Sequence, residues 1–179
     1  EVNDDTILRN DLANELITTS LYGLVVDHDE KGISEAEVCI ETENGEICHI
    51  TDSNGMFIFD SIKVSRSVYL TVFKDGFFNG YRRQTLYENE LNYTKIHLMD
   101  KQNGGTFYNE EGGRAVYKDS SEVIFPPNSL VLKSDGSTYD GEVRVWINKI
   151  HPNALSFFDQ IPGNLTGYDL GGELSAMAS

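Results

Sequence analysis

Alternating apolar and polar positions dominate the chain from residue 18 onward and predict β-strands, because every second residue of a strand faces the same side. The clearest runs are Leu21-Gly23-Val25, Ala36-Val38-Ile40, Val68-Leu70-Val72 and Val143-Val145-Ile147. Turn signals recur between strands, at Asp29-Glu30-Lys31-Gly32, Asn44-Gly45, Ser53-Asn54-Gly55, Lys74-Asp75-Gly76 and Ser134-Asp135-Gly136. Short strands at this spacing, with no long amphipathic helix between them, predict an all-β sandwich or barrel.

Two places divide the chain into parts. Thr6–Ile17 has apolar residues at roughly helical spacing, and we expect a short helix or an extended arm there. The polar, Gly-rich stretch 100–105 separates two sets of strand signals. We therefore expect an N-terminal arm over 1–17 and two tandem β-sandwich domains over 18–101 and 102–179. Residues 174–179 have the pattern of a beginning strand, so we expect the second domain to be truncated in this sequence.

The two cysteines, Cys39 and Cys48, flank the turn at Glu43-Asn44-Gly45-Glu46. A two-residue Asn-Gly turn would place both on the same face, diagonally, whereas a three-residue loop with a bulge at Gly45 would place them on opposite faces. The second register gives the better core pattern, with Val38, Ile40, Cys48 and Ile50 on one face. We therefore favour two free thiols over a Cys39–Cys48 disulfide, and the redox compartment stays undecided at this stage.

The chain is acidic, with a formal net charge of −15 from 29 acidic and 14 basic residues. A field of this sign repels phosphate backbones and excludes nucleic acid as a partner, whereas it suits cations or a basic protein surface. No apolar run approaches the ~20 residues that span a bilayer, and the first residues lack the pattern of a signal peptide. We expect a cytosolic protein or the mature part of an exported one, in which the polar N-terminus would follow a removed signal or a lipid anchor.

Residues 20–99 carry an ordered set of motifs: Gly-x-Val-x-Asp, then Ala-x-Val-x-Ile, then Thr-Asp-x-x-Gly-x-Phe, and a closing Lys-x-Gly-aromatic. The matching residues are Gly23, Val25, Asp27, Ala36, Val38, Ile40, Thr51, Asp52, Gly55, Phe57, Lys74, Gly76 and Phe77. This stretch resembles the carboxypeptidase regulatory-like domain, a seven-stranded transthyretin-like (prealbumin-like) sandwich. Ile33-Ser34 departs from the proline-containing segment that is common there.

The second half resembles the β-domain that follows such modules in surface proteins of Bacteroidota. The run from Val123 to Leu130 is also similar, more weakly, to the start of ZU5-type domains. The resemblance implies an accessory role without catalysis, in exported peptidases, outer-membrane receptors and surface lipoproteins. It therefore implies a periplasmic or cell-surface location.

Two polar loops offer oxygen ligands for a cation. In Thr51-Asp52-Ser53-Asn54-Gly55 the following positions are apolar, so a calcium loop lacks its later ligands and a hairpin turn is favoured. In the loop Asp27-His28-Asp29-Glu30, Asp27 and Asp29 are candidate Ca²⁺ ligands, although a solvated acidic loop is the more common arrangement. We expect no other cofactor.

The segment FKDGFFNGYRR, residues 73–83, is the most distinctive candidate surface. Exposed aromatic rings with polar neighbours can stack on sugars or bind protein. Because Phe77 matches a core aromatic of the family, Phe78 and Tyr81 are the candidate ligand-binding rings, with Arg82 and Arg83 beside them. The alternative is that these aromatics close the core while the arginines solvate the rim.

Two common catalytic motifs are absent from the sequence, although a glycosidase-like pair among the 29 acidic residues stays open, because spacing in the sequence does not constrain such a pair. None of the four histidines lies in His-Glu-x-x-His, and no Gly-x-Ser-x-Gly elbow occurs. We therefore predict a non-enzymatic extracellular or cell-surface module that binds a protein or a glycan. The alternative is a set of accessory domains of a larger exported peptidase, glycan-processing or outer-membrane transport protein.

Overall fold

The computed structural model describes residues 15–118, 121–150, 166–168 and 174–176. All regular elements in these ranges are β-strands, so the predicted all-β class is confirmed. No helix in these ranges is long and apolar enough to cross a membrane. Within the described ranges, residues 15–99 belong to one compact unit and residues 100–150 to a second. We call residues 15–99 the sandwich unit and residues 100–150 the ribbon unit.

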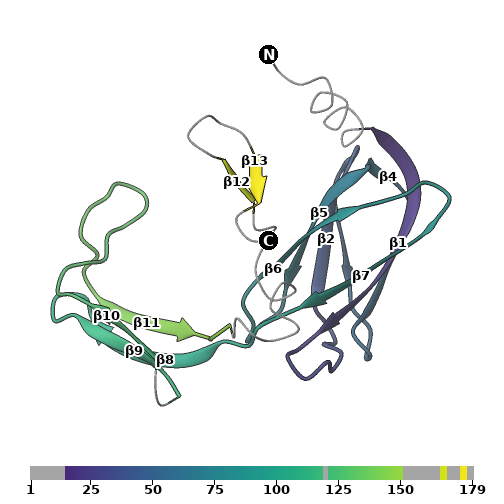
Figure 1. The fold of residues 1–179 in the computed structure, drawn as a ribbon. Helices are drawn as coiled ribbons and strands as arrows, with labels where there is room; N and C mark the ends of the chain where they lie inside the picture. Colours follow the sequence, from purple (N-terminus) through teal and green to yellow (C-terminus); the bar gives the residue numbers. More distant parts are fainter. Residues whose placement is uncertain (1–14, 119–120, 151–165, 169–173, 177–179) are drawn as a thin grey trace. The chain divides into compact units, whose positions relative to one another are not determined.

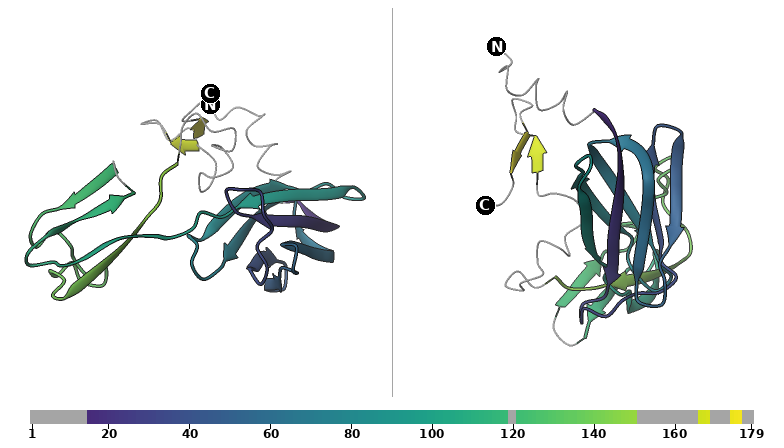
Figure 2. Two further views of the ribbon diagram at one scale, coloured as in Figure 1. Left: turned by 90° about the horizontal axis from the view of Figure 1, so that it is seen from below. Right: turned by 90° about the vertical axis from the view of Figure 1, so that its right-hand side faces the viewer.

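The sandwich unit contains seven strands in two sheets (Figure 1). A three-stranded sheet has the order β4-β1-β7, formed by Met56–Ser65, Leu16–Val26 and Leu91–His97. A four-stranded sheet has the order β3-β2-β5-β6, formed by Gly45–Ile50, Glu37–Thr42, Ser67–Phe73 and Gly80–Thr85. β1 runs parallel to β7, and the remaining neighbours are antiparallel. The two layers can also be followed in Figure 2.

The core lies between the two sheets and takes alternate residues from each strand, as the sequence pattern predicts. The three-stranded sheet contributes Ile17, Leu21, Val25, Phe57, Phe59, Ile62, Val64 and Ile96. The four-stranded sheet contributes Val38, Ile40, Val68, Leu70 and Val72, and Phe77 packs against this cluster as the expected core aromatic. Burial of these apolar side chains is the main stabilising contribution to the unit.

The predicted N-terminal arm over 1–17 extends too far, because it includes Leu16 and Ile17. Both belong to β1, and Ile17 is buried in the core. The rest of the predicted helix Thr6–Ile17 lies outside the described residues, apart from Glu15.

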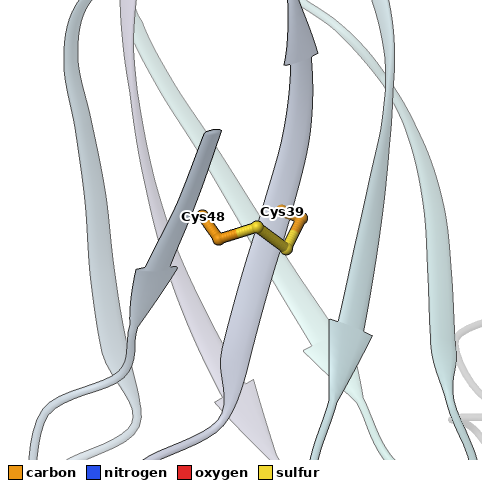
Figure 3. The surroundings of a disulfide bond; sticks show 2 residues. All are labelled: Cys39 and Cys48. Carbon is orange, nitrogen blue, oxygen red and sulfur yellow. A yellow bond between two sulfur atoms is a disulfide. The ribbon is translucent and has the colours of Figure 1, made fainter. Parts of the chain in front are cut away.

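Cys39 and Cys48 form a disulfide, so the prediction of two free thiols is wrong (Figure 3). The hairpin turn uses Glu43 and Asn44, which places Cys39 directly opposite Cys48, with their Cα atoms 4.1 Å apart. The hydroxyl of Thr42 donates to the carbonyl oxygen of Gly45 at 2.7 Å and accepts from the amide of Asn44 at 3.2 Å. This turn produces neither of the two registers expected from the sequence.

The ribbon unit consists of two antiparallel strand pairs. β8 (Gln102–Tyr108) pairs with β11 (Glu142–Ile147), and β9 (Gly113–Tyr117) pairs with β10 (Ser121–Phe125). Trp146 on β11 is 44% exposed.

The buried side chain of Asn109 ties the long 126–141 connection of the ribbon unit to β8. Its amide nitrogen donates to the carbonyl oxygens of Leu130 at 3.1 Å and Tyr139 at 2.7 Å, and its oxygen accepts from the amide of Leu130 at 3.1 Å.

Near the end of the chain, β12 (Thr166–Tyr168) pairs antiparallel with β13 (Leu174–Ala176). The strand expected to begin at residue 174 is therefore present.

Candidate functional site

The outer face of the four-stranded sheet carries a group of exposed aromatic side chains. Val38, Leu70 and Val72 point into the core, so their neighbours along β2 and β5 point outward. We call this outward surface the aromatic face. It is formed by Glu37, Cys39, Cys48, Ile50, Tyr69, Thr71, Phe73, Tyr81 and Arg83.

The strand register places three rings around one small residue. Thr71 lies opposite Tyr81 on β6 and opposite Cys39 on β2. Tyr69 and Phe73 lie two residues to either side of Thr71 on β5, so both are diagonal neighbours of Tyr81. The side chains of Tyr69, Phe73 and Tyr81 are 60%, 37% and 46% exposed, respectively. The three rings therefore surround the short side chain of Thr71 on a surface open to solvent.

Arg83 adds a cation to this face. Its guanidinium carbon lies 5.6 Å from the centre of the Tyr69 ring, within the range of a cation–π interaction. Its Nε donates to the hydroxyl of Ser67 at 2.8 Å. These two contacts favour one orientation of the guanidinium beside the Tyr69 ring.

The four predicted ligand-binding residues separate in the structure. Tyr81 and Arg83 lie on the aromatic face, whereas Arg82 between them points to the other side of β6. Phe78 precedes β6, is half-buried, and its amide donates to the carbonyl oxygen of Met99 at 2.7 Å. Tyr69 and Phe73 were not predicted from the sequence, although their alternation with Val68, Leu70 and Val72 indicates that both point outward.

In the acidic loop after β1, a side chain accepts hydrogen bonds from the backbone of the same loop. Oδ1 of Asp27 accepts from the amides of Asp29 at 2.9 Å and Lys31 at 3.0 Å, which is an Asx-type turn. The carboxylate of Asp29 lies 3.3 Å from Nε2 of His28. The Ca²⁺ site at Asp27 and Asp29 stays a prediction. Among the described residues, three potential ligand atoms of His, Cys, Asp or Glu come together only at Glu37, Cys39 and Cys48.

The loop Thr51–Gly55 is a turn, as favoured from the sequence, but it is not the corner of a hairpin, because β3 and β4 on either side of it belong to different sheets. Oδ1 of Asp52 accepts from the amides of Asn54 at 2.9 Å and Met56 at 2.8 Å, and Gly55 has a φ of +83°. A Cβ at Gly55 would lie 2.4 Å from the carbonyl oxygen of Val25, so glycine is required for both its backbone angle and its contact. The carboxylate of Asp52 therefore stabilises the turn through these two hydrogen bonds.

His97 on β7 is buried. Its Nε2 lies 2.8 Å from Oε1 of Glu30, and Oε2 of Glu30 accepts from Nζ of Lys95 at 2.8 Å. The hydrogen bonds from Lys95 and then His97 lower the pKa of the Glu30 carboxyl. This exposed carboxylate links the acidic loop to β7.

No family model matches the chain, and no curated protein matches it. Solved structures with some similarity include hydroxyquinol 1,2-dioxygenase from Pseudomonas putida DLL-E4, at 8% identity and a TM-score of 0.38, covering 47% of this chain and 57% of that one. The Bacillus anthracis TIE protein is 10% identical with a TM-score of 0.42, over 73% of this chain and 26% of that one.

A DUF3823 family protein from Parabacteroides merdae is 14% identical with a TM-score of 0.35, over 57% of this chain and 54% of that one. The chain spans between 53% and 62% of the length of the four dioxygenases that it matches. These values are too low for any of these structures to bear on function.

Proposed function

We propose that this chain is a non-enzymatic binding module of an exported protein and that it binds a carbohydrate chain through the aromatic face. The observation that carries the proposal is the placement of Tyr69, Phe73 and Tyr81, three exposed rings on two adjacent strands of one sheet face. When the apolar face of a sugar covers an exposed ring, the apolar area of the ring is removed from water, and this favours binding.

Polar groups beside the rings can supply the hydrogen bonds that stacking alone does not provide. Thr71 lies among the three rings, and Arg83 stands beside Tyr69. A hydroxyl and a guanidinium can exchange hydrogen bonds with sugar hydroxyls, which fixes the orientation of a ligand that the rings hold by stacking. The net charge of −15 repels acidic polysaccharides, so a neutral glycan is the ligand class we favour.

Two features support an exported location, in the periplasm or at the cell surface. The Cys39–Cys48 disulfide is typical of proteins that mature in an oxidising compartment. The resemblance of residues 20–99 to carboxypeptidase regulatory-like domains, described above from the sequence, suggests the same location and an accessory role.

The test is binding of the purified chain to a panel of neutral glycans, followed by titration calorimetry on those that bind. Tyr81→Ala should weaken binding at least tenfold, because the central ring is lost. Tyr93→Ala is the matched control, since Tyr93 is a tyrosine of similar exposure on the outer face of the other sheet. It should bind as the unchanged chain does.

Two results would overturn the proposal. The first is a folded chain that binds no neutral glycan. The second is an equal loss of affinity in Tyr81→Ala and Tyr93→Ala, which would place the ligand elsewhere. Binding of a protein instead, with sensitivity to Tyr81→Ala, would keep the face as the site and replace the ligand class.

A further inference from the structure

The β2–β3 hairpin places three potential metal ligands at one point on its outward side. The carboxylate of Glu37 and the sulfur atoms of Cys39 and Cys48 all lie within 4.8 Å of one another. Glu37 is two residues before Cys39 on β2, so both side chains leave the strand on the same face. Cys48 lies directly opposite Cys39 on β3.

We propose that reduction of the Cys39–Cys48 disulfide opens a binding site for a thiophilic divalent cation of the Zn²⁺ class, with Cys39, Cys48 and Glu37 as its protein ligands. The disulfide form cannot bind the cation in this way, since its sulfur atoms are bonded to each other and carry no thiolate charge. The site is thus gated by the redox state of the pair.

The geometry fits a tetrahedral ion. With Zn–S bonds of about 2.3 Å, two thiolates on one ion lie roughly 3.8 Å apart. Side chains from directly opposite residues, whose Cα atoms are 4.1 Å apart, can reach this separation by side-chain rotation alone. The carboxylate of Glu37 supplies the third ligand, and water completes the fourth position, as in zinc sites with three protein ligands.

The surrounding charge also favours a cation. Glu41 and Glu46 are directly opposite each other on the same outward side, one further pair along the hairpin. Together with Glu37 they place three carboxylates on this side of two short strands. Two carboxylates directly opposite repel each other, so a divalent cation nearby is stabilised by their combined field.

The chemistry balances with a dithiol as the reductant. The dithiol transfers two electrons to the Cys39–Cys48 bond and becomes a disulfide itself, while its two protons end on the cysteine sulfurs. The cation then displaces one proton from each thiol into solvent, and Glu37 binds as the carboxylate it already is. Reoxidation of the pair would release the ion.

The experiment compares the oxidised 179-residue chain with the same chain after reduction by a dithiol and removal of the dithiol under exclusion of air. Zn²⁺ is titrated against a chromophoric chelator, and Cd²⁺ is added separately to record thiolate-to-metal charge-transfer absorbance. The reduced chain should take up one Zn²⁺ and show the Cd²⁺ band, whereas the oxidised chain should do neither.

Two variants give the site its controls. Glu37→Gln should weaken Zn²⁺ binding by the reduced chain at least tenfold. Glu88→Gln, the same change at an exposed position outside the hairpin, should leave Zn²⁺ binding unchanged. Circular dichroism of the reduced chain reports whether the sheets persist. Absence of Zn²⁺ uptake, equal binding by Glu37→Gln and the unchanged chain, or loss of sheet signal on reduction that Zn²⁺ does not restore would each overturn the proposal.

Discussion

Glu30 Oε1 lies 2.8 Å from Nε2 of His97, although the two residues come from a turn after the first strand and from the end of the seventh. The second oxygen of the same carboxylate accepts from Lys95 at 2.8 Å. Glu30 has a φ of +63°, a left-handed conformation that is uncommon for a residue with a side chain. Its contacts with β7 therefore hold the acidic loop in a backbone conformation that the loop alone would disfavour.

Glu30→Gln should reduce stability at neutral pH, and the difference from the unchanged chain should vanish in acid. The pKa of Glu30 is lowered in the folded state, first by the hydrogen bond from Lys95 and then by that from His97. The contribution of the carboxylate is therefore present above the unfolded pKa, about 4.5, and is lost as pH falls through the lowered folded value.

Urea unfolding midpoints of both proteins between pH 3 and pH 7 measure this effect. Glu88→Gln, an exposed change in a loop, is the control and should follow the unchanged chain throughout. A constant gap between Glu30→Gln and the unchanged chain over the whole range would show that the carboxylate charge is irrelevant.

Asn92→Ala should destabilise the sandwich unit by about 2–3 kcal/mol, because it leaves buried polar groups without partners. The amide nitrogen of Asn92 donates to Oγ1 of Thr19 at 2.8 Å and to the carbonyl oxygen of Tyr87 at 2.9 Å, and its oxygen accepts from the amide of Tyr87 at 2.8 Å. Urea denaturation followed by circular dichroism measures the loss. Asn79→Ala, at an exposed position, should stay within about 0.5 kcal/mol of the unchanged chain.

Gly23→Ala should cost about 1–3 kcal/mol through overpacking. Gly23 pairs with Phe57 across β1 and β4, and a Cβ at Gly23 would lie 2.0 Å from the tip of the Phe57 ring. Combining Gly23→Ala with Phe57→Leu should recover part of the loss, since the smaller side chain vacates that space. A double-mutant cycle from thermal unfolding tests this, and strict additivity of the two changes would rule out the clash as the cause.

Asn109→Ala should destabilise the ribbon unit by about 2–3 kcal/mol, because the Leu130 and Tyr139 backbone groups lose their buried partner. Trp146 is the sole tryptophan of the chain and lies in this unit, so its fluorescence reports the local transition. The urea midpoint of this signal should fall. Asn103→Ala is the control and should lower the midpoint less, because the Asn103 side chain accepts a hydrogen bond from the amide of Gly105 at an exposed site.

The strands and the core could be predicted from the sequence, because burial of one sheet face imposes a period of two. Leu21, Val38, Leu70 and Val72 are all buried where alternation placed them. The burial of His97 could not be predicted in this way, because a polar residue in a strand gives no indication that the distant carboxylate of Glu30 contacts it. Pairings of that kind depend on which loops meet, and local pattern carries no information about them.

The candidate site was predictable only where its residues are close in sequence. Tyr81 and Arg83 were found because they share one short segment, whereas Tyr69 joins them only through the pairing of β5 with β6. The cysteine pairing was missed for a similar reason. Asn44-Gly45 is the strongest hairpin signal in this segment, yet the turn lies one residue earlier, where the Thr42 side chain bonds both sides of it.

Replacing both cysteines, as Cys39→Ser with Cys48→Ser, should lower the free energy of unfolding by about 2 kcal/mol. The bond joins residues nine apart in sequence, so it restricts a short loop of the unfolded chain and contributes less than a bond across a long loop would. The core below the hairpin should persist, because Val38 and Ile40 on the opposite side of β2 remain buried. Urea denaturation of the oxidised chain and the double variant measures the difference. Equal stability, or thiols that react in the folded unchanged chain, would show that the hairpin holds its register without the bond.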